Sequence, residues 1–404
     1  VLVLLPAALI LSLPRRAASG LDRLIPQAAL LQSFRVQPAA PPPPLWQQRL
    51  GAQQAQRLWQ GQRGLWWQFW GAHGDAAAYL VLNPVQGVPL PAQAVQVDDL
   101  AVVASDPLAR QLLIEQLRAR RRAPRGLAQR CSASLQQSPA VLWNAAAVGQ
   151  LLGPLAPLAQ ALEQGCLVLR GEGRTLSWQG EADASEAPMA EPPQALPLPK
   201  SPPLQGPQLL DLRGDRLELL LRGPLESSLV RQVLAQTYGL GPEQLRRWGA
   251  LPFGLRLRAL PSGPFRAGLE LELESRRDAA LTSWLTQLSH ALQDQGLSQG
   301  GTTPELTTWS REDGTLVGGW RWRADGHLLL FLGPVPNVQA ARVPLAEASW
   351  RLRMQPRALA TAGLLPEALP PVLRRADHVV LQGRPKGIRS GERLSALSGS
   401  LSLP

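Results

Sequence analysis

The sequence predicts an α+β fold of two related units of antiparallel sheet with packed helices, after an N-terminal apolar segment and a proline-rich tether. Segments with the two-residue alternation of strands are interspersed with segments that carry apolar residues at helical spacing. Turns rich in Gly, Asp and Pro separate many of them. The 404 residues, of which 45% are hydrophobic and 18% charged, are enough for two such units.

Residues 1–19 form the apolar segment, which we interpret as a signal peptide or membrane anchor. The stretch from Val1 to Leu13 is uncharged and almost wholly apolar, and it ends at Pro14 and two arginines. It is shorter than the ~20 residues that a membrane-spanning helix needs, but it fits the apolar core of a signal peptide. A buried N-terminal helix is the alternative interpretation.

Two proline-rich stretches set the predicted domain boundaries. Residues 20–63 are predicted to be a linker, because Gln37 to Pro44 (QPAAPPPP) favours extended polyproline conformation. Residues 187–207 contain too many prolines for a helix or an interior strand. The sequence therefore predicts a first α+β unit over 64–186, a linker over 187–207 and a second α+β unit over 208–404.

The first unit should alternate strands with helices. Asp106 followed by Pro107 is a typical helix start, and the helix should extend to Leu117. Gly171 to Arg174 should form the turn of a hairpin. Strands are predicted at 65–70, 77–82, 100–104, 166–170 and 175–180.

The second unit shows the same pattern more clearly. A hairpin should turn at Gly214, and an amphipathic helix with Leu225, Leu229, Val233 and Leu234 on one face should follow. A later helix is predicted between Asp278 and Gly296, with a core stripe that includes Trp284. Predicted hairpins pair 209–213 with 216–221, 255–259 with 267–274, and 319–322 with 327–332.

Glutamates alternate with leucines in one of these strands. Glu270, Glu272 and Glu274 should share a face with Arg256 and Arg258 of the preceding strand. Such a row is compatible with acid/base chemistry or a cation site. We expect a solvated sheet face instead, because catalytic carboxylates need burial that shifts their pKa.

A repeat supports two related units. Residues 152–171 align without gaps with residues 364–383, and in both a Leu-, Pro- and Ala-rich segment leads to a strand and a glycine. Upstream, residues 138–142 parallel 355–359 after a short gap, and downstream Leu176 and Ser177 parallel Leu394 and Ser395. Convergence within a chain rich in Ala, Leu and Pro is the alternative.

The net charge of +11 would suit an anionic partner. A run of basic residues comprises Arg118, Arg120, Arg121 and Arg122, and it is typical of a helix C-terminus, where cations complement the helix dipole. A dedicated phosphate site is the alternative. The sequence contains no nucleic-acid-binding motif, so we expect no nucleic-acid partner.

Tryptophans cluster after the first proline-rich stretch, at Trp59, Trp66, Trp67 and Trp70. This cluster and the basic run are the candidate residues for a partner or membrane surface. For the tryptophans, filling of the core is the alternative, with Trp66 and Trp70 facing inward.

Cys131 and Cys166 are the chain's two cysteines. After export they could form a disulfide, whereas a reduced protein with a small buried residue at Cys166 is the alternative.

Recognisable catalytic, cofactor or metal motifs are absent, and we predict no catalytic, cofactor-binding or metal-binding residues and no cofactor. The four histidines, His73, His290, His327 and His378, are isolated in the sequence. Asp98 and Asp99 are adjacent before a strand and should point to opposite faces, so they should not share a proton or a metal.

The layout resembles a family of uncharacterised cyanobacterial membrane-anchored proteins of the envelope or thylakoid. The resemblance lies in the N-terminal anchor, the proline-rich spacer and α+β regions with strand segments such as LAVVASDP. It implies a membrane-associated, extracytoplasmic location, in the periplasm or thylakoid lumen. The expected function is that of a non-enzymatic membrane-tethered protein that binds or organises a protein or lipid partner, including anionic lipid. A hydrolase or small-molecule carrier with a site of dispersed residues is the alternative.

Overall fold

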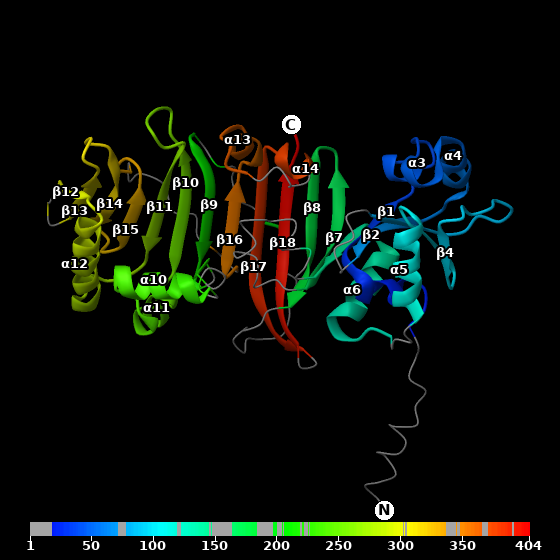
Figure 1. Ribbon diagram of the computed structural model, residues 1–404, viewed down its shortest axis with the longest axis horizontal. Helices are drawn as coiled ribbons and strands as arrows, with labels where there is room; N and C mark the ends of the chain where they lie inside the picture. The colour runs from blue at the N-terminus through cyan, green and yellow to red at the C-terminus, as the bar shows by residue number, and fades with distance from the viewer. Residues whose placement is uncertain are drawn as a thin grey trace, which may run out of the picture. The chain divides into compact units, whose positions relative to one another are not determined.

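The computed structural model divides the chain into two compact units, one of Val1–Ala147 with Gln164–Leu169 and one of Val148–Glu163 with Arg170–Pro404. Each unit combines helices with an antiparallel sheet, which confirms the α+β class (Figure 1). The structure describes residues 18–71, 78–118, 123–144, 147, 164–183, 197–199, 204, 206–218, 220–221, 225, 227–301, 303, 305–336, 345, 348–365, 371–389 and 392–404.

The first unit has strand β1 at the centre of its sheet. β1 pairs with β2 on one side and with β6 on the other. The strand order is β4-β5-β3-β2-β1-β6-β7. The strands are β1 (Ala28–Arg35), β2 (Leu65–Gly71), β3 (Tyr79–Leu82), β4 (Ala94–Val97), β5 (Leu100–Val103), β6 (Ala140–Trp143) and β7 (Gly165–Glu172), of which residues 165–169 belong to this unit.

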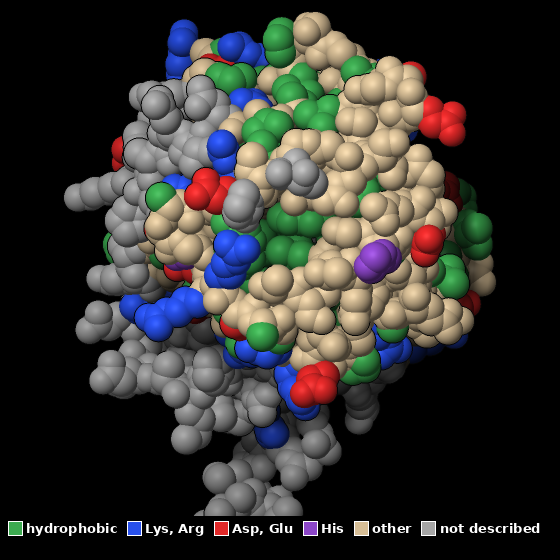
Figure 2. All heavy atoms as spheres, turned by 90° about the vertical axis from the view of Figure 1, so that its left-hand side faces the viewer, with side chains coloured by type: hydrophobic (Ala, Val, Ile, Leu, Met, Phe, Trp, Pro, Cys, Tyr) green, Lys and Arg blue, Asp and Glu red, His purple; other side chains and the backbone are tan. Residues whose placement is uncertain are grey.

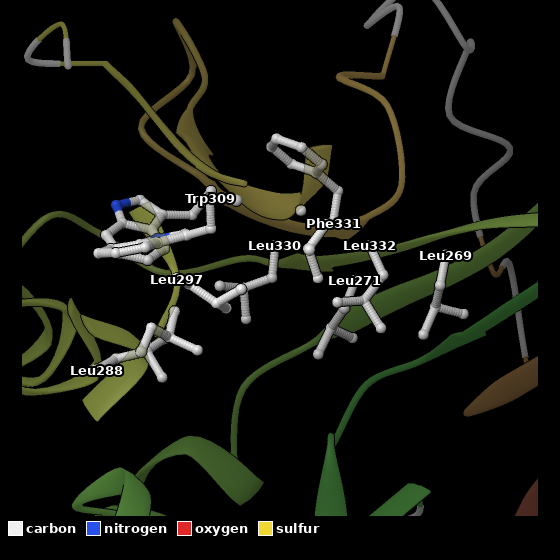
Figure 3. A pocket seen from close by; sticks show the side chains of 13 residues that line it. Leu269, Leu271, Leu288, Leu297, Trp309, Leu330, Phe331 and Leu332 are labelled. Atoms are coloured by element: carbon white, nitrogen blue, oxygen red, sulfur yellow. The ribbon is translucent and has the colours of Figure 1, made fainter. Parts of the chain in front are cut away.

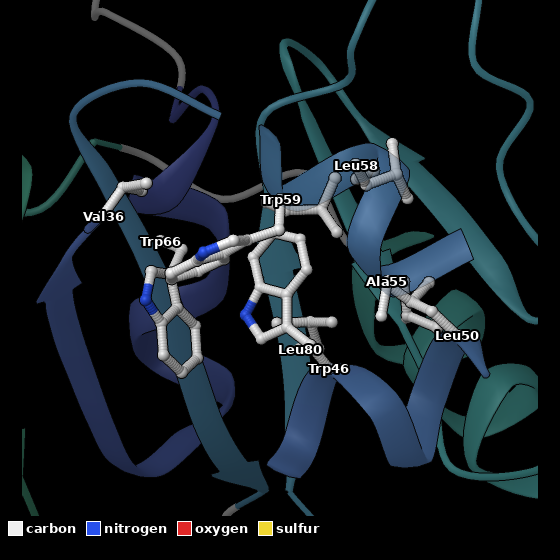
Figure 4. Close-up of a cluster of buried hydrophobic side chains, with 11 residues drawn as sticks. Val36, Trp46, Leu50, Ala55, Leu58, Trp59, Trp66 and Leu80 are labelled. Carbon is white, nitrogen blue, oxygen red and sulfur yellow. The ribbon is translucent and has the colours of Figure 1, made fainter. Parts of the chain in front are cut away.

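Helices cover both faces of this sheet. On one face, Trp46 of α3 and Trp59 of α4 contact Trp66 of β2 edge to face, within a buried apolar cluster (Figure 4). On the other face, the indole nitrogen of Trp67 donates a hydrogen bond to Leu135 O of α6 at 2.8 Å. The helices are α2 (Leu21–Leu24), η1 (Ile25–Gln27), α3 (Pro44–Leu50), α4 (Ala52–Gly61), α5 (Pro107–Arg118) and α6 (Gly126–Gln137).

A disulfide joins Cys131 of α6 to Cys166 of β7, with their Cα atoms 5.6 Å apart. Both cysteines are buried. The bond closes a loop of 35 residues in sequence separation and attaches β7 to a helix that covers the sheet. Such a bond is typical of proteins in oxidising compartments.

The second unit contains the longer sheet. Its strand order is β12-β13-β14-β15-β11-β10-β9-β16-β17-β18-β8. The strands are β8 (Thr175–Asp183), β9 (Gln208–Gly214), β10 (Phe253–Ala259), β11 (Ala267–Leu273), β12 (Ser298–Gly300), β13 (Leu306–Ser310), β14 (Leu316–Trp322), β15 (Leu328–Leu332), β16 (Trp350–Met354), β17 (His378–Arg389) and β18 (Glu392–Ser402).

One face of this sheet packs against helices. Trp284 and Leu285 of α12 lie in an apolar cluster with Trp248 of α11 and Phe253 of β10. Asp278 caps α12 as predicted, because its carboxylate accepts the Leu281 N–H at 2.8 Å. The helices are α10 (Ser228–Tyr238), α11 (Pro242–Gly249), α12 (Ala279–Asp294), α13 (Pro356–Thr361) and α14 (Pro371–Arg374).

The pairing order of the strands is repeated between the two units. In the first, β2, β1, β6 and β7 are successive neighbours, and in the second β10, β9, β16 and β17 are. The aligned sequence segments end in β7 and β17, which are equivalent in this order. The upstream alignment is wrong, however, because residues 140–143 form strand β6 whereas residues 356–361 form helix α13. Residues 148–163 and 366–370 lie outside the described residues.

Two local predictions need correction. Residues 20–63 are not a linker, because they include the central strand β1 and helices α3 and α4, and Gln37 to Pro44 connects β1 to α3. The strands of a sheet pair over long sequence separations, which the local proline content does not reveal. The hairpin predicted around Gly214 is also wrong, because the chain after β9 forms a helical turn whose Leu217 is buried in the apolar cluster.

Within the described part of the chain, no helix combines the length and apolar character needed to span a bilayer. Residues 1–17 of the predicted signal peptide or anchor lie outside that part.

Candidate functional site

An apolar pocket of about 300 Å³ lies in the second unit, between the C-terminal half of α12 and strands β11, β14 and β15. Its walls carry no titratable side chain. Figure 3 shows Leu271 and Leu330 from the sheet beside Leu288 and Leu297, with Trp309 at one end. The lining residues are Leu269, Leu271, Leu288, Leu292, Leu297, Trp309, Val317, Gly318, Gly319, Trp320, Leu330, Phe331 and Leu332.

The alternation that predicted the strands also builds this pocket. Leu269 and Leu271 of β11 point to the helix-covered face, and in the antiparallel register they lie opposite Leu332 and Leu330 of β15. Gly318 of β14 contributes space rather than a side chain. A Cβ atom at this position would lie 2.3 Å from Phe331 O, so the close approach of β15 requires glycine.

The pocket is open to solvent. Leu332, at the end of β15, is 56% exposed, and Leu288 and Leu292 of α12 are half-buried. At the end of the unit where β12 and β13 lie, hydrophobic side chains gather in a hollow of the surface (Figure 2). A ligand can therefore reach the pocket without separation of the helix from the sheet.

The opposite face of the same sheet carries a ladder of alternating charges. Arg353 of β16, Asp211 of β9, Arg256 of β10 and Glu270 of β11 are successive cross-strand neighbours. Glu272 lies two residues beyond Glu270 on the same face. We call these five residues the charge ladder.

The charge ladder is buried, not solvated as the alternation led us to expect. Arg256 donates to Glu272 at 2.9 Å, and Arg353 Nε donates to Asp211 at 3.1 Å. All of these residues except Glu270 are buried, and the Glu270 side chain is only 12% exposed. Alternation shows that the residues share a face, but it does not show whether other segments cover that face.

Segments for which the sequence predicted no helix or strand pack on this face, and their backbone carbonyls accept hydrogen bonds from its side chains. Gln382 and Ser398, both buried, donate hydrogen bonds to Pro197 O at 2.9 Å each. Arg351 donates to Leu345 O at 2.9 Å. The described part of the predicted linker over 187–207 is therefore hydrogen-bonded to the strands of the second unit.

At the end of the charge ladder formed by Arg353, the pKa of a neighbouring guanidinium is lowered. Burial lowers the pKa of Arg351, and the charges of Arg353 and Arg213 lower it further, whereas Asp211 raises it. Arg213 Nε also lies 3.2 Å from Asp211. The carboxylate of Asp211 is thus shared by several guanidiniums.

Three metal-ligating side chains meet at the other end of the ladder. Ligand atoms of Glu272, Asp325 and His327 lie within 4.8 Å of one another. Glu272 also contacts Arg256 at 2.9 Å and Arg323 at 3.4 Å. A metal ion bound here would lie beside two guanidiniums, and this electrostatic repulsion disfavours it. We interpret the group as an ion-pair cluster.

The candidate surface residues do not form one surface. Trp59, Trp66 and Trp67 are buried in the first unit, which contradicts their assignment to a membrane or partner surface and favours the core alternative. Trp70 is half-buried. Large aromatic side chains dominate the packing of protein cores, and these tryptophans fill the core of the first unit.

The basic run is only partly described. Arg118 is exposed at the end of α5, and residues 119–122 lie outside the described residues. Asp98 and Asp99 lie in the turn between β4 and β5, directly before the strand that begins at Leu100. The carboxylate of Asp98 accepts the Gly20 N–H at 2.6 Å, which is a structural role.

The comparisons with known proteins do not assign this site. No protein-family model matches the chain, and no curated protein matches it in sequence. Two solved structures, described as crystal forms I and III of TP0453, resemble it at 8% identity. Each comparison covers 48% of this chain, and 89% or 90% of the other, with a TM-score of 0.26. A likeness at this TM-score carries no argument about function.

Sequence reasoning missed the pocket. The predicted core stripe of α12 includes Leu288 and Leu292, and both pack against the apolar cluster of the second unit as well as lining the pocket. One signal was available, namely the adjacent Gly318 and Gly319 in a strand otherwise rich in large residues. Glycine within a strand weakens packing and marks a site of close approach.

Proposed function

We propose that the protein is a non-enzymatic, membrane-tethered extracytoplasmic protein whose second unit binds the acyl chain of a lipid. The observation that carries this proposal is the open pocket of about 300 Å³ with walls of Leu, Trp, Phe, Val and Gly. Pockets of about this size or larger, lined mainly by hydrophobic and aromatic side chains, are typical of small-molecule sites. A flexible alkyl chain matches the apolar character of the walls and can adapt its conformation to them.

The charges of the second unit support binding rather than catalysis. Asp211, Arg256 and Glu272 lie in ion pairs beneath the surface, on the face opposite the pocket. A general acid or base must reach the bond that it acts on. The charge ladder does not line the pocket, and its contacts serve the stability of the sheet.

The extracytoplasmic location is part of the proposal. The apolar N-terminal segment favours export or anchoring, and the Cys131–Cys166 disulfide is typical of an oxidising compartment. The resemblance to cyanobacterial membrane-anchored proteins favours the same location. A lipid ligand is then available at the membrane that the N-terminal segment would contact.

Binding can be tested with the fluorescent fatty acid cis-parinaric acid, displaced by saturated fatty acids of increasing length. Each methylene removed from water contributes about 0.8 kcal/mol, so affinity should rise about fourfold per carbon until the pocket is full and then level off. Replacement of Leu292 by Phe narrows the pocket. It should weaken binding of the longest chains most, because they need the full volume.

The matched control is Leu112→Phe on α5 of the first unit, at a half-exposed leucine remote from the pocket residues in sequence. It should bind like the wild type. Affinity that does not depend on chain length, or equal weakening by both variants, would contradict an acyl-chain site in this pocket.

A further inference from the structure

A polar pocket of about 670 Å³ lies in the second unit, where β9 and β17 begin and β10 and β16 end. Helix α13, which follows β16, forms one of its walls (Figure 1). Charged and polar side chains line it, whereas the apolar pocket has none with a charge. These side chains belong to Gln355, Arg357, Thr361, Asp377 and His378.

Backbone hydrogen bonds fix the positions of the two charged residues. The Arg357 N–H, in the first turn of α13, donates to Ala376 O at 3.0 Å. The Asp377 N–H, directly before β17, donates to Ser402 O of β18 at 2.9 Å. Arg357 and Asp377 therefore project from backbone that is held in place without a ligand, which lowers the cost of ordering the site on binding.

The two charges lie side by side and remain open to solvent. Arg357 Nη2 is 2.9 Å from Asp377 Oδ1, and the side chains are 60% and 29% exposed. A ligand with a single charge would be attracted by one of these groups and repelled by the other. A ligand that carries both charges would complement both groups, so the pocket favours a zwitterion.

His378 adds a polar atom that the protein leaves without a partner. Its Nδ1 is buried and has no hydrogen-bond partner within the described part of the chain. Because Nδ1 is buried, a ligand in the pocket can contact this ring only at Nε2. Buried polar groups are normally hydrogen-bonded, so the unpaired imidazole at the wall of a pocket favours a polar ligand.

The spacing of the charges indicates the kind of zwitterion. Because the two charges of the wall are in direct contact, the two charges of the ligand must also be close together. In an α-amino acid a single carbon atom separates the ammonium group from the carboxylate. The remaining wall is aliphatic and suits an aliphatic side chain; it consists of Leu209, Ala259, Ala358 and Ala362.

We propose that this pocket binds an aliphatic α-amino acid, with the carboxylate of the ligand on Arg357 and its ammonium group on Asp377. His378 Nε2 donates a further hydrogen bond to the ligand carboxylate. This inference goes beyond the proposed function, because it requires neither the apolar pocket nor an acyl chain. It gives the second unit a second binding site, for a small water-soluble ligand.

Isothermal titration calorimetry of the full chain with L-leucine tests the site. L-Leucine should bind saturably, with one molecule per chain. Two analogues each lack one charge, namely 3-methylbutylamine without the carboxylate and 4-methylpentanoate without the ammonium group. Each should bind at least about tenfold more weakly, because one charged group of the wall then loses its partner and the other charge of the ligand is no longer balanced.

Two variants test the assignment to this pocket. Arg357→Gln and Asp377→Asn should each weaken binding of L-leucine at least about tenfold and keep the fold, because neither side chain is buried. The matched control is Arg247→Gln, which removes an exposed ion pair with Asp278 of the same unit, where the side chains are 57% and 42% exposed. Arg247 does not line the pocket, and this variant should bind as the wild type.

The analogue series uses only wild-type protein, so it tests the proposal even if a variant fails to fold. Absence of saturable L-leucine binding would overturn the proposal. Equal affinity for either analogue would also overturn it, because the ligand would then need one charge and not two. The same holds for unchanged affinity in the folded Arg357 and Asp377 variants, which would place the ligand elsewhere.

Discussion

The charge ladder should stabilise the second unit only while its charges stay matched. Asp211 is the informative position, because its carboxylate contacts Arg353 Nε at 3.1 Å, Arg213 Nε at 3.2 Å and Arg256 Nε at 3.7 Å. Its side chain is only 4% exposed. Asp211→Asn keeps the shape and removes the charge, so the buried Arg353 and Arg256 would face a neutral amide.

The expected loss of unfolding free energy is large, although Asp211→Asn replaces only one oxygen by an amide nitrogen. Removal of one partner from a buried ion pair costs about 3 to 5 kcal/mol, because the remaining charge stays buried without compensation. We expect the lower end, since Arg256 retains Glu272 and Arg213 is partly exposed. In urea unfolding, a loss of about 3 kcal/mol with a slope of about 3 kcal/mol per molar moves the midpoint by about 1 M.

The assay is equilibrium unfolding in urea followed by circular dichroism. The matched control is Glu218→Gln, which breaks the exposed pair with Arg216, whose side chains are 43% and 49% exposed, and should cost less than about 1 kcal/mol. The double variant Asp211→Asn, Arg353→Met should recover part of the loss, since it removes an unmatched charge. A loss no larger than that of the control, or strictly additive losses, would refute the reasoning.

Two further predictions concern pH and oxidation. The protein around Asp215 raises the pKa of its carboxyl by desolvation, so this group favours folding below its unfolded pKa of about 3.9, and the benefit disappears as pH rises through the folded pKa. Asp215→Asn should therefore be more stable than the wild type at neutral pH and equal to it in acid; a constant difference in thermal unfolding across that range would contradict this. Cys131→Ser with Cys166→Ser should lower the stability of the first unit by about 3 to 4 kcal/mol in non-reducing buffer, with no difference from the wild type in reducing buffer.

Local sequence patterns determined many of the elements. Helix α12 begins after Asp278 and ends just before Gly296, as its cap and turn residues predict. The pairing of β10 with β11 and of β14 with β15 follows from alternation and from the glycine-containing turns between them. Each of these features depends on neighbours in sequence, so it can be predicted from neighbours in sequence.

The environment of each face was decided by the tertiary structure. Glu272 and Arg256 alternate with leucines just as surface residues do, yet both are buried. Pro197, in a segment that the sequence marks only as proline-rich, accepts hydrogen bonds from β17 and β18. Alternation separates the two faces of a strand, but burial depends on which distant segments cross them.

The pocket and the position of the central strand β1 both depend on contacts between segments that are distant in sequence. β1 takes its central position because it pairs with β2 on one side and with β6 on the other. β6 is more than a hundred residues away from β1 along the chain. The pocket lies between α12 and β15 beside Gly318, where Phe331 O leaves no room for a side chain. The sequence by itself determined the elements and their two faces, whereas long-range pairing decided which faces are buried, because burial is a property of the assembled chain.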